Sequence, residues 1–249
     1  MDKTGEKMAL RIIAPDRPGI ATSEFQRGRT LVDWPPLLLE LAEHLGFGKF
    51  HVLGVSGGGP YALVCAHALP ERLLSAGIIC GAPPLREVGT EGLFWMYKVA
   101  MWAQKRLPFT VPPGLRVGGW IAGRRLNQWP QTWLSHFYAA EDKRALQDER
   151  LHRIMMDSSR AALLGDANAV RHDGNLYSSD WGFNLADIRF PVRFWHGDDD
   201  WNIPLALAQK AAARIPGAHF KVSPRDGHFS LPLLRSEEIV SELLGSAAA

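Results

Sequence analysis

A serine set among glycines, between a strand-like run and a helix-like run, constrains this chain more than any other feature. The apolar run 49–55 ends at Ser56, and three glycines then lead into a segment of small residues. Gly54-Val55-Ser56-Gly57-Gly58 fits G-x-S-x-G, in which the serine sits on a sharp, strained turn with its hydroxyl exposed. Glycine suits both flanking positions because a Cβ would collide with neighbouring backbone. The alternative, an ordinary glycine-rich turn, is disfavoured by the flanking strand and helix.

Length and composition fit one large domain, or a core with an insertion. The chain has 249 residues, 46% of them hydrophobic, which is enough to bury a sizeable core. The net charge of +2, without a long run of lysine or arginine, argues against nucleic acid as the main partner. Cys65 and Cys80 belong to no C-x-x-C motif, and we expect both to be reduced core residues.

Neither a signal peptide nor a membrane span is evident in the sequence. Residues 1–7 are charged and lack the apolar segment of a signal peptide. No apolar run is long enough to span a bilayer. We therefore expect a soluble, cytoplasmic protein, and no feature of the sequence predicts an oligomeric state.

Strand-like and helix-like segments alternate at both ends of the chain. Such alternation predicts an α/β domain with a mainly parallel sheet and flanking helices. The expected strands are 8–15, 50–55, 74–80, 191–197 and 218–222, and the expected helices are 33–45, 60–69, 205–215 and a last helix through Ile239 and Leu243.

The long segment between these two parts lacks strand patterns and is rich in aromatic, helix-forming runs. We expect a helical cap at 83–186, inserted into a core made of 1–82 and 187–249. The run 93–107 has three charged residues and is predicted to be a lid helix packed on the core; an interfacial membrane helix is the alternative. Aromatic residues of the segment suggest an apolar pocket: Trp95, Trp102, Trp129, Trp133 and Tyr138.

Two loops carry the partners that a reactive serine requires, a base and an acid that orients it. In parallel sheets such groups belong on loops at the carboxyl ends of strands. The loop after the fourth expected strand offers three aspartates, 198–200, and the loop after the last strand offers His228. A calcium loop of the EF-hand type starting at Asp198 is excluded, because Ile203 and Gln209 stand where glycine and glutamate are required.

Together, four motifs resemble the α/β-hydrolase family. They are the G-x-S-x-G turn at Ser56, which we call the elbow, the turn Asp16-Arg17-Pro18-Gly19, the G-x-x-D-x-x-x-P run from Gly197 to Pro204, and Gly227-His228. The resemblance covers nearly the whole chain. It implies that Asp200, three residues after the strand-end glycine, is the acid and that His228 is the general base. It also implies that the amide of Gly57, at the start of a helix, donates to the oxyanion.

The same resemblance implies a reaction class. It implies no metal and no organic cofactor, and a serine in place of aspartate disfavours a haloalkane dehalogenase. The expected activity is hydrolysis of an ester-like or related small apolar substrate through an acyl-enzyme, with Ser56 as the nucleophile. Esterase, thioesterase, lactonase and carbon–carbon hydrolase activities stay open, as does acyl transfer to an acceptor other than water.

The N-terminus departs from the family pattern. In that family about 40–50 residues, with three strands and the loop of the second oxyanion donor, precede the strand that here ends at Pro15. We expect an N-terminally truncated fold with a gap in mid-sheet beside the strand 50–55. Either the true start lies upstream, or the strands 8–15 and 50–55 pair directly, or the chain is a degraded or repurposed hydrolase. Loss of one oxyanion donor costs about 10²–10³ in rate, so the alternative function is a non-catalytic or weakly active ligand-binding protein.

Overall fold

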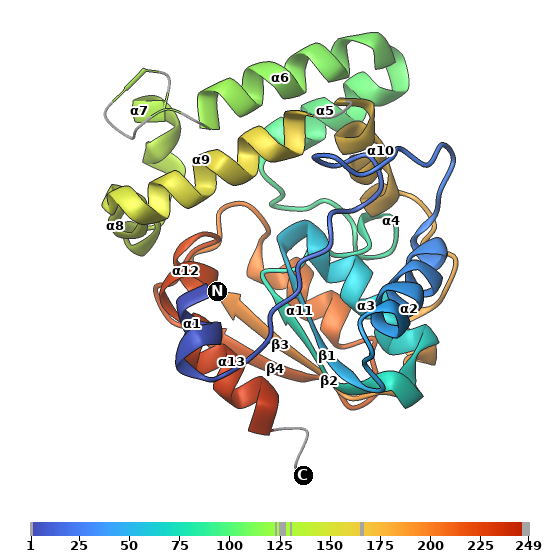
Figure 1. Cartoon of the computed structure of the whole chain (residues 1–249). Helices are drawn as coiled ribbons and strands as arrows, with labels where there is room; N and C mark the ends of the chain where they lie inside the picture. Colours follow the sequence, from blue (N-terminus) through green and yellow to red (C-terminus); the bar gives the residue numbers. More distant parts are fainter. Residues whose placement is uncertain (1, 123, 125–127, 130, 165–166, 246–249) are drawn as a thin grey trace.

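A parallel sheet forms the centre of the protein (Figure 1). The computed structural model describes residues 2–122, 124, 128–129, 131–164 and 167–245. Within these residues the sheet has four strands in the order β1-β2-β3-β4, and each neighbouring pair is parallel. The predicted α/β fold with a parallel sheet is therefore confirmed. The strands are β1 (Phe50–Val55), β2 (Leu73–Ile79), β3 (Val192–Gly197) and β4 (His219–Ser223).

Helices flank both faces of this sheet: α1 (Asp2–Lys7), α2 (Trp34–His44), α3 (Gly59–Ala68), α11 (Leu205–Ala212), α12 (Ser230–Leu234) and α13 (Ser236–Gly245). Neighbouring residues of a strand point to opposite faces, so each face has its own core. Ile78 and Phe194 pack in one cluster with α3 and α11. Ile79 and Trp195 pack in another with α12 and α13. Outside these helices, α2 contacts α3 and α1 contacts α13.

The first predicted strand, residues 8–15, is wrong. After α1 the chain turns at Ala9, which has a φ of +52°, and residues 10–16 continue without strand pairing. A strand needs a hydrogen-bonded neighbour, and in the described part of the chain β1 pairs with β2 alone. Ile12 and Ile13, in the middle of this segment, are 43% and 38% exposed. The direct pairing of this segment with β1 does not occur, and β1 forms an edge of the described sheet.

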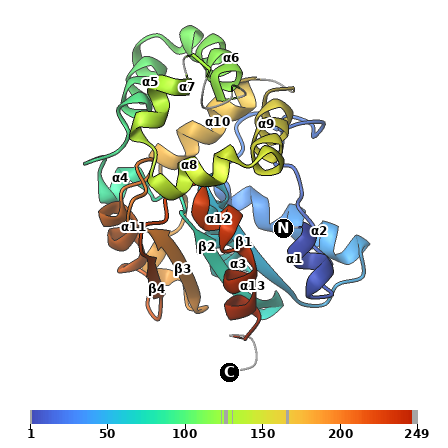
Figure 2. The same ribbon diagram turned by 90° about the vertical axis from the view of Figure 1, so that its left-hand side faces the viewer.

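The predicted cap segment consists largely of helices: α4 (Leu85–Val88), α5 (Trp95–Arg106), α6 (Val111–Ala122), α7 (Gln131–Leu134), α8 (Ala140–Gln147), α9 (Glu149–Leu164) and α10 (Ala167–Ser178). We refer to α5–α9 as the helical layer. It lies at the end of the molecule opposite α13 (Figures 1 and 2). Helix α6 contacts α9 and α10, and α8 contacts α12. The division into a core of 1–82 and 187–249 and a cap of 83–186 stays a prediction.

Helix α5 differs from the lid helix predicted at 93–107. A surface helix normally buries an apolar stripe against the protein, yet none of the 12 residues of α5 is buried. Trp95, Val99 and Trp102, which share one side of the helix, are 49%, 51% and 57% exposed. Met101 packs against the edge of the core. The apolar stripe of α5 therefore faces solvent.

Cys65 and Cys80 are buried and free, as predicted. Among the described residues, no helix combines the length and the apolar character needed to cross a membrane.

Candidate active site

Ser56 occupies the turn that the sequence predicts. It follows β1 directly and opens a 3₁₀ turn, Ser56–Gly58, that leads into α3. Its φ of +51° lies in the left-handed region, a strain of about 1–3 kcal/mol for a residue other than glycine. A Cβ on Gly54 would lie 2.4 Å from the carbonyl oxygen of Gly58, so the strand and helix backbones approach too closely for a side chain. A Cβ on Gly58 would meet nothing within 4 Å, so the second glycine of the motif is not required by space.

The three residues predicted as a triad lie in hydrogen-bond contact. Nε2 of His228 is 2.9 Å from Oγ of Ser56, and Nδ1 of His228 is 2.9 Å from Oδ2 of Asp200. The serine follows β1, the aspartate follows β3 and the histidine follows β4, so all three loops leave the carboxyl ends of parallel strands. Asp200 and His228 are buried, and Ser56 is half-buried. The other two aspartates of the loop, Asp198 and Asp199, are exposed.

Asp200 is held by more than the triad histidine. Its Oδ1 accepts the backbone N–H groups of Asn202 and Ile203 at 2.8 and 2.9 Å. Nε2 of His196 donates to the carbonyl oxygen of Ile203 at 2.9 Å and lies 3.4 Å from Oδ2 of Asp200. Sequence reasoning treated His196 as a structural histidine and missed this contact. Its position at the end of β3, four residues before Asp200, is the signal that could have found it.

The charges of the triad shift each other's pKa values. Burial lowers the pKa of His228, but the Asp200 carboxylate outweighs burial and raises this pKa above its ordinary value. Burial raises the pKa of Asp200, but the charge and the N–H of His228 hold it below its ordinary value. Burial lowers the pKa of His196. At neutral pH, Asp200 is therefore ionised and His196 is neutral.

Cys80, His196 and Asp200 form a buried cluster whose possible metal-binding atoms lie within 4.8 Å of one another. Their hydrogen bonds favour a different role. Nε2 of His196 carries the proton that it donates to Ile203, so this nitrogen has no lone pair for a metal. Burial, and next the Asp200 carboxylate, raise the pKa of the Cys80 thiol well above its ordinary value, so the sulfur stays protonated. We therefore interpret Cys80 and His196 as residues that pack around Asp200 and hold it in place, and not as metal ligands.

A carboxylate from the helical layer holds the loop that carries the histidine. Asp142, in α8, is fully buried, and its Oδ2 accepts the N–H of His228 at 3.1 Å. Its Oδ1 accepts the N–H groups of Phe229 and Ser230 at 3.0 and 2.7 Å. A Cβ on Gly227 would lie 2.4 Å from the carboxylate, so the glycine before the histidine makes room for it. Sequence reasoning missed Asp142 because no local pattern connects it to a loop 86 residues away.

A cluster of charged and phenolic side chains contacts the elbow at Gly57. The carbonyl oxygen of Gly57 accepts hydrogen bonds from Nη1 of Arg17 at 3.0 Å and from the hydroxyl of Tyr177 at 3.1 Å. Nε of Arg17 lies 2.9 Å from the buried carboxylate of Asp173, which also pairs with Arg29. The turn after the serine is therefore fixed by groups from two distant parts of the chain.

The amide of Gly57, the predicted oxyanion donor, lies at the N-terminal end of the 3₁₀ turn. The first N–H groups of a helix have no partner within it. The peptide unit that carries this N–H is held in place, because its carbonyl, from Ser56, accepts the N–H of Ala82 at 2.9 Å. The role of Gly57 stays a prediction.

Aromatic side chains pack beside the loops that carry Asp200 and His228. Trp201, next to Asp200, stacks on Tyr138 with ring centroids 4.9 Å apart, and Phe94 packs edge-on against Trp201 at 4.6 Å. Phe229, next to the triad histidine, packs edge-on against Tyr138 at 5.6 Å. The four tryptophans predicted to line a pocket have about half or more of their surface exposed: Trp95, Trp102, Trp129 and Trp133.

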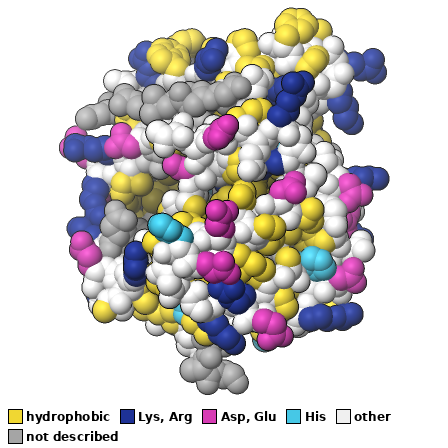
Figure 3. Space-filling view, turned by 45° about the vertical axis from the view of Figure 1, so that its right-hand side comes forward, with side chains coloured by type: hydrophobic (Ala, Val, Ile, Leu, Met, Phe, Trp, Pro, Cys, Tyr) yellow, Lys and Arg dark blue, Asp and Glu magenta, His cyan; other side chains and the backbone are white. Residues whose placement is uncertain are grey.

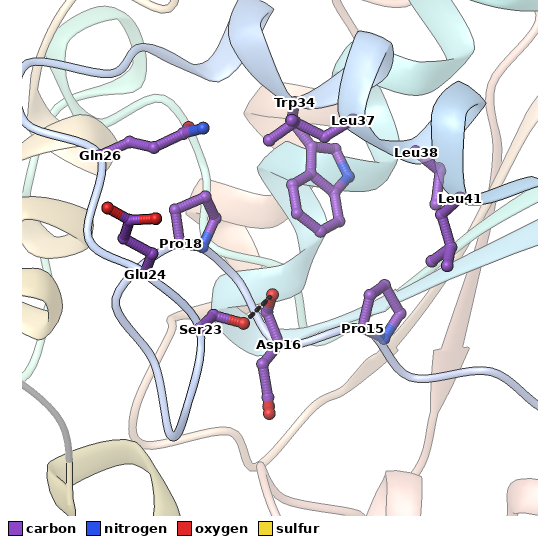
Figure 4. Close-up of a pocket in the computed structure, with 10 residues that line it drawn as sticks. All are labelled: Pro15, Asp16, Pro18, Ser23, Glu24, Gln26, Trp34, Leu37, Leu38 and Leu41. Carbon is purple, nitrogen blue, oxygen red and sulfur yellow. Dashed lines mark hydrogen bonds between the residues drawn. The ribbon is translucent and has the colours of Figure 1, made fainter. Parts of the chain in front are cut away.

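A cavity of about 280 Å³ lies apart from the triad, between α2 and the loop that begins at Pro15 (Figure 4). Trp34 and Leu38 contribute to its apolar wall, and the loop contributes Asp16 and Glu24. None of the three triad residues lines this cavity.

Fold and site together match one family. A parallel sheet with flanking helices carries a serine, an aspartate and a histidine in that order along the chain, which is the α/β-hydrolase order. The model of the alpha/beta hydrolase fold matches residues 6–233. The chain belongs to the α/β-hydrolase fold family. The resemblance drawn from the four motifs is thereby confirmed.

At low sequence identity, the chain is similar to α/β-hydrolases that are named for different activities. The chain is 24% identical over 235 residues to the candidate carbamate hydrolase RutD of Caulobacter vibrioides, covering 92% of this chain and 77% of RutD. It is 25% identical over 260 residues to a proline iminopeptidase of Lactobacillus delbrueckii, covering 98% and 82%. Among solved structures, a thermophilic esterase of Thermogutta terrifontis is similar in fold, with a TM-score of 0.67, 20% identity, and coverage of 100% and 85%.

Proposed function

We propose that this α/β-hydrolase is a serine hydrolase that cleaves an ester-like or related small apolar substrate through an acyl-enzyme. The observation that carries the proposal is the continuous line of hydrogen bonds from Ser56 through His228 to Asp200, with both distances 2.9 Å. A serine hydroxyl on a strained turn, a histidine within reach of it and a carboxylate that orients the histidine are the components of nucleophilic acyl transfer.

In the first half of the reaction, Oγ of Ser56 attacks the carbonyl carbon of the substrate while Nε2 of His228 accepts the hydroxyl proton. The Asp200 carboxylate holds Nδ1–H and stabilises the imidazolium that forms. The amide of Gly57 donates to the oxyanion of the tetrahedral intermediate. His228 then gives its proton to the leaving oxygen, the carbon–oxygen bond breaks, and the acyl group stays on Ser56.

In the second half, water takes the place of the leaving alcohol. His228 accepts a proton from this water as its oxygen attacks the acyl carbon. Collapse of the second tetrahedral intermediate returns the proton to Ser56 Oγ and releases the carboxylic acid. Each cycle therefore consumes one water and releases one alcohol and one carboxylic acid.

The aromatic side chains beside the acid and base loops support an apolar substrate. Trp201, Phe229, Tyr138 and Phe94 form one connected cluster that reaches both loops of the triad. Apolar pockets with a few polar groups are typical of small-molecule sites. The names of the relatives, an esterase, an iminopeptidase and a candidate carbamate hydrolase, support hydrolysis as the class of reaction.

Release of nitrophenolate from p-nitrophenyl acetate and butyrate tests the proposal. We expect an initial burst that scales with enzyme concentration, followed by slower turnover, because the acyl-enzyme accumulates. Ser56→Ala removes the nucleophile and is expected to abolish the burst and lower kcat by at least about 10³-fold. Ser179→Ala, which changes an exposed serine away from the elbow, is the matched control and is expected to behave as the wild type.

Three other results would indicate a different function or a different site. A folded chain without burst or turnover, but stabilised by small apolar esters, would favour the ligand-binding alternative. Turnover that persists unchanged in Ser56→Ala would place the reaction elsewhere in the protein. Esters of added alcohols among the products would indicate acyl transfer in competition with hydrolysis.

A further inference from the structure

One stretch of the helical layer combines many aromatic residues with basic residues and has no acidic residue of its own. Residues 92–140 include five of the nine tryptophans of the chain, six lysines and arginines, and no aspartate or glutamate. The rest of the chain holds more acidic than basic residues. Charge and aromatic content are therefore concentrated together, in α5, α6, α7 and their connections.

The aromatic and branched side chains of this stretch face solvent. Phe109 and Trp129 are 73% and 75% exposed, and Trp120 is 51% exposed. Large exposed apolar areas on a protein usually mark an interaction site. Figure 3 shows hydrophobic and basic side chains together along the upper rim of the molecule, over the helical layer. We define the aromatic–basic surface as Trp95, Val99, Trp102, Phe109, Val117, Trp120, Trp129 and Trp133 with Lys98, Lys105, Arg106, Arg116 and Arg124.

Helical spacing gathers these residues into stripes. Trp95 and Trp102 lie two turns apart on the exposed side of α5, and Val117 and Trp120 lie one turn apart on α6. The guanidinium of Arg124 lies 4.0 Å from the ring centroid of Trp120, so positive charge borders the apolar stripe directly. The inner side of α6 is occupied, because α6 contacts α9 and α10. Val117 and Trp120, on the outer stripe, are 57% and 51% exposed.

We propose that the aromatic–basic surface docks this protein on a membrane surface that contains anionic lipids. Helices that lie in the interface of a bilayer present tryptophan, phenylalanine and leucine to the acyl chains and lysine or arginine to the headgroups. Tryptophan is favoured at headgroup depth because its ring has an apolar body and a polar N–H. Juxtamembrane lysines and arginines are attracted to phosphatidylserine and other anionic lipids.

The charge pattern selects this partner over two others. A second copy of the chain, docked through a two-fold axis, would bring the same surface against itself. The five basic residues of the surface would then face five more, with no carboxylate from residues 92–140 between them. Nucleic acid would pair with the basic residues through its phosphates, but exposed side chains such as Val99 and Val117 would gain nothing from phosphates.

Docking of this kind would turn the triad end of the molecule toward the lipid. The helical layer lies over the loop of the triad histidine, because Asp142 of α8 contacts His228, Phe229 and Ser230. The outer side of the same layer carries the aromatic–basic surface. An apolar ester dissolved in the bilayer would therefore be concentrated on the side of the protein where the serine lies.

Sedimentation of the full chain with vesicles tests the proposal. We expect the protein to bind vesicles of phosphatidylcholine mixed with phosphatidylserine, to bind pure phosphatidylcholine far more weakly, and to dissociate as salt is added, because salt screens the attraction. Lys98→Glu/Lys105→Glu is expected to weaken binding by about thirtyfold or more, since each lysine near an anionic surface contributes about fivefold. Lys49→Glu/Arg189→Glu changes net charge equally, at exposed positions outside the helical layer, and is expected to bind as the wild type.

A second pair of variants separates the apolar part from the charge. Trp102→Ala/Trp120→Ala is expected to weaken binding while leaving its salt dependence unchanged. Absence of binding to phosphatidylserine vesicles at low salt would overturn the proposal, as would equal loss in the two charge variants. A wild-type dimer in light scattering that becomes a monomer in Trp102→Ala/Trp120→Ala would assign the surface to a second copy instead. Labelling of Ser56 without vesicles is independent of all these outcomes.

Discussion

Asp142 of the helical layer accepts the backbone N–H of His228 at 3.1 Å. The same carboxylate accepts the next two N–H groups of that loop, so three successive amides end on one buried side chain. None of these three hydrogen bonds involves the imidazole ring of His228. The contact instead fixes the backbone of the loop that carries the imidazole. The position of the imidazole relative to Ser56 therefore depends on the position of α8.

Replacement of Asp142 should therefore impair catalysis as well as stability. In Asp142→Ala, three buried N–H groups lose their acceptor, and an unsatisfied buried donor costs about 1–3 kcal/mol. We expect kcat on p-nitrophenyl butyrate to fall about 10- to 100-fold with little change in KM, because a small misplacement of a catalytic group costs about 10²-fold. Asp142→Asn keeps one acceptor oxygen and should lie between this variant and the wild type.

Asp148→Ala is the matched control for this effect. Asp148 is exposed and accepts the N–H groups of Arg150 and Leu151 at the start of α9, so it also caps backbone in the helical layer. Its loss should cost about 0.5–2 kcal/mol of stability in urea unfolding and leave kcat unchanged. An equal fall of kcat in both variants would mean that Asp142 acts only through the stability of the layer.

The acid limb of kcat/KM should report the titration of His228. His228 acts as a base only when neutral, and the Asp200 carboxylate raises its pKa above the ordinary value of about 6.5. Activity should therefore rise with pH through a midpoint above about pH 6.5. The negative charge of Asp142 also raises this pKa, so Asp142→Asn should move the midpoint to lower pH. A midpoint near the ordinary pKa of a carboxyl group, unaffected by Asp142→Asn, would contradict this assignment.

Of the three aspartates after β3, Asp200 alone should be needed for turnover. Asp200→Asn keeps the shape of the side chain but no longer orients and stabilises a protonated histidine, and we expect kcat to fall by about 10⁴-fold. Asp199→Asn changes an exposed neighbour and should leave kcat within about twofold of the wild type, as is usual for surface substitutions. Steady-state kinetics of the two variants distinguishes them, and similar losses in both would contradict the assigned acid.

A side chain on Gly57, the glycine after the serine, should destabilise the fold by displacing Tyr177. A Cβ on Gly57 would lie 2.4 Å from the hydroxyl oxygen of Tyr177, whereas a Cβ on Gly58 would meet nothing within 4 Å. Gly57→Ala should cost about 1–3 kcal/mol in urea unfolding, and Gly58→Ala should cost little. Tyr177→Phe removes the clashing oxygen, so it should restore part of the stability of Gly57→Ala in a double-mutant cycle. Additive losses would show that the two residues do not interact.

The sequence could predict the triad because each member belongs to a local motif. Ser56 lies in a strand–turn–helix pattern, and Asp200 and His228 follow recognisable strand ends. In a parallel sheet the carboxyl ends of strands meet at one edge, so local patterns were enough to bring three distant residues together. The two hydrogen bonds of 2.9 Å agree with that inference, while the roles assigned to these residues stay a prediction.

Contacts that depend on tertiary packing could not be predicted in this way. Asp142 has no sequence signal, because the loop that it holds lies 86 residues further along the chain. The expected strand 8–15 had a suitable apolar pattern, but a strand also needs a hydrogen-bonded neighbour, and residues 10–16 do not pair with the free edge of β1. Trp95 and Trp102 matched the composition of a pocket, yet composition does not specify which side of a helix faces the protein.

The most direct test of the proposed function is labelling by a serine-reactive fluorophosphonate, read by intact mass for the wild type and Ser56→Ala. A hydroxyl reacts rapidly only when a neighbouring base activates it, so we expect one adduct on the wild type and none on the variant. Urea unfolding of both proteins provides the control for folding. An adduct on Ser56→Ala, or no adduct on a wild type that unfolds cooperatively, would contradict an activated Ser56.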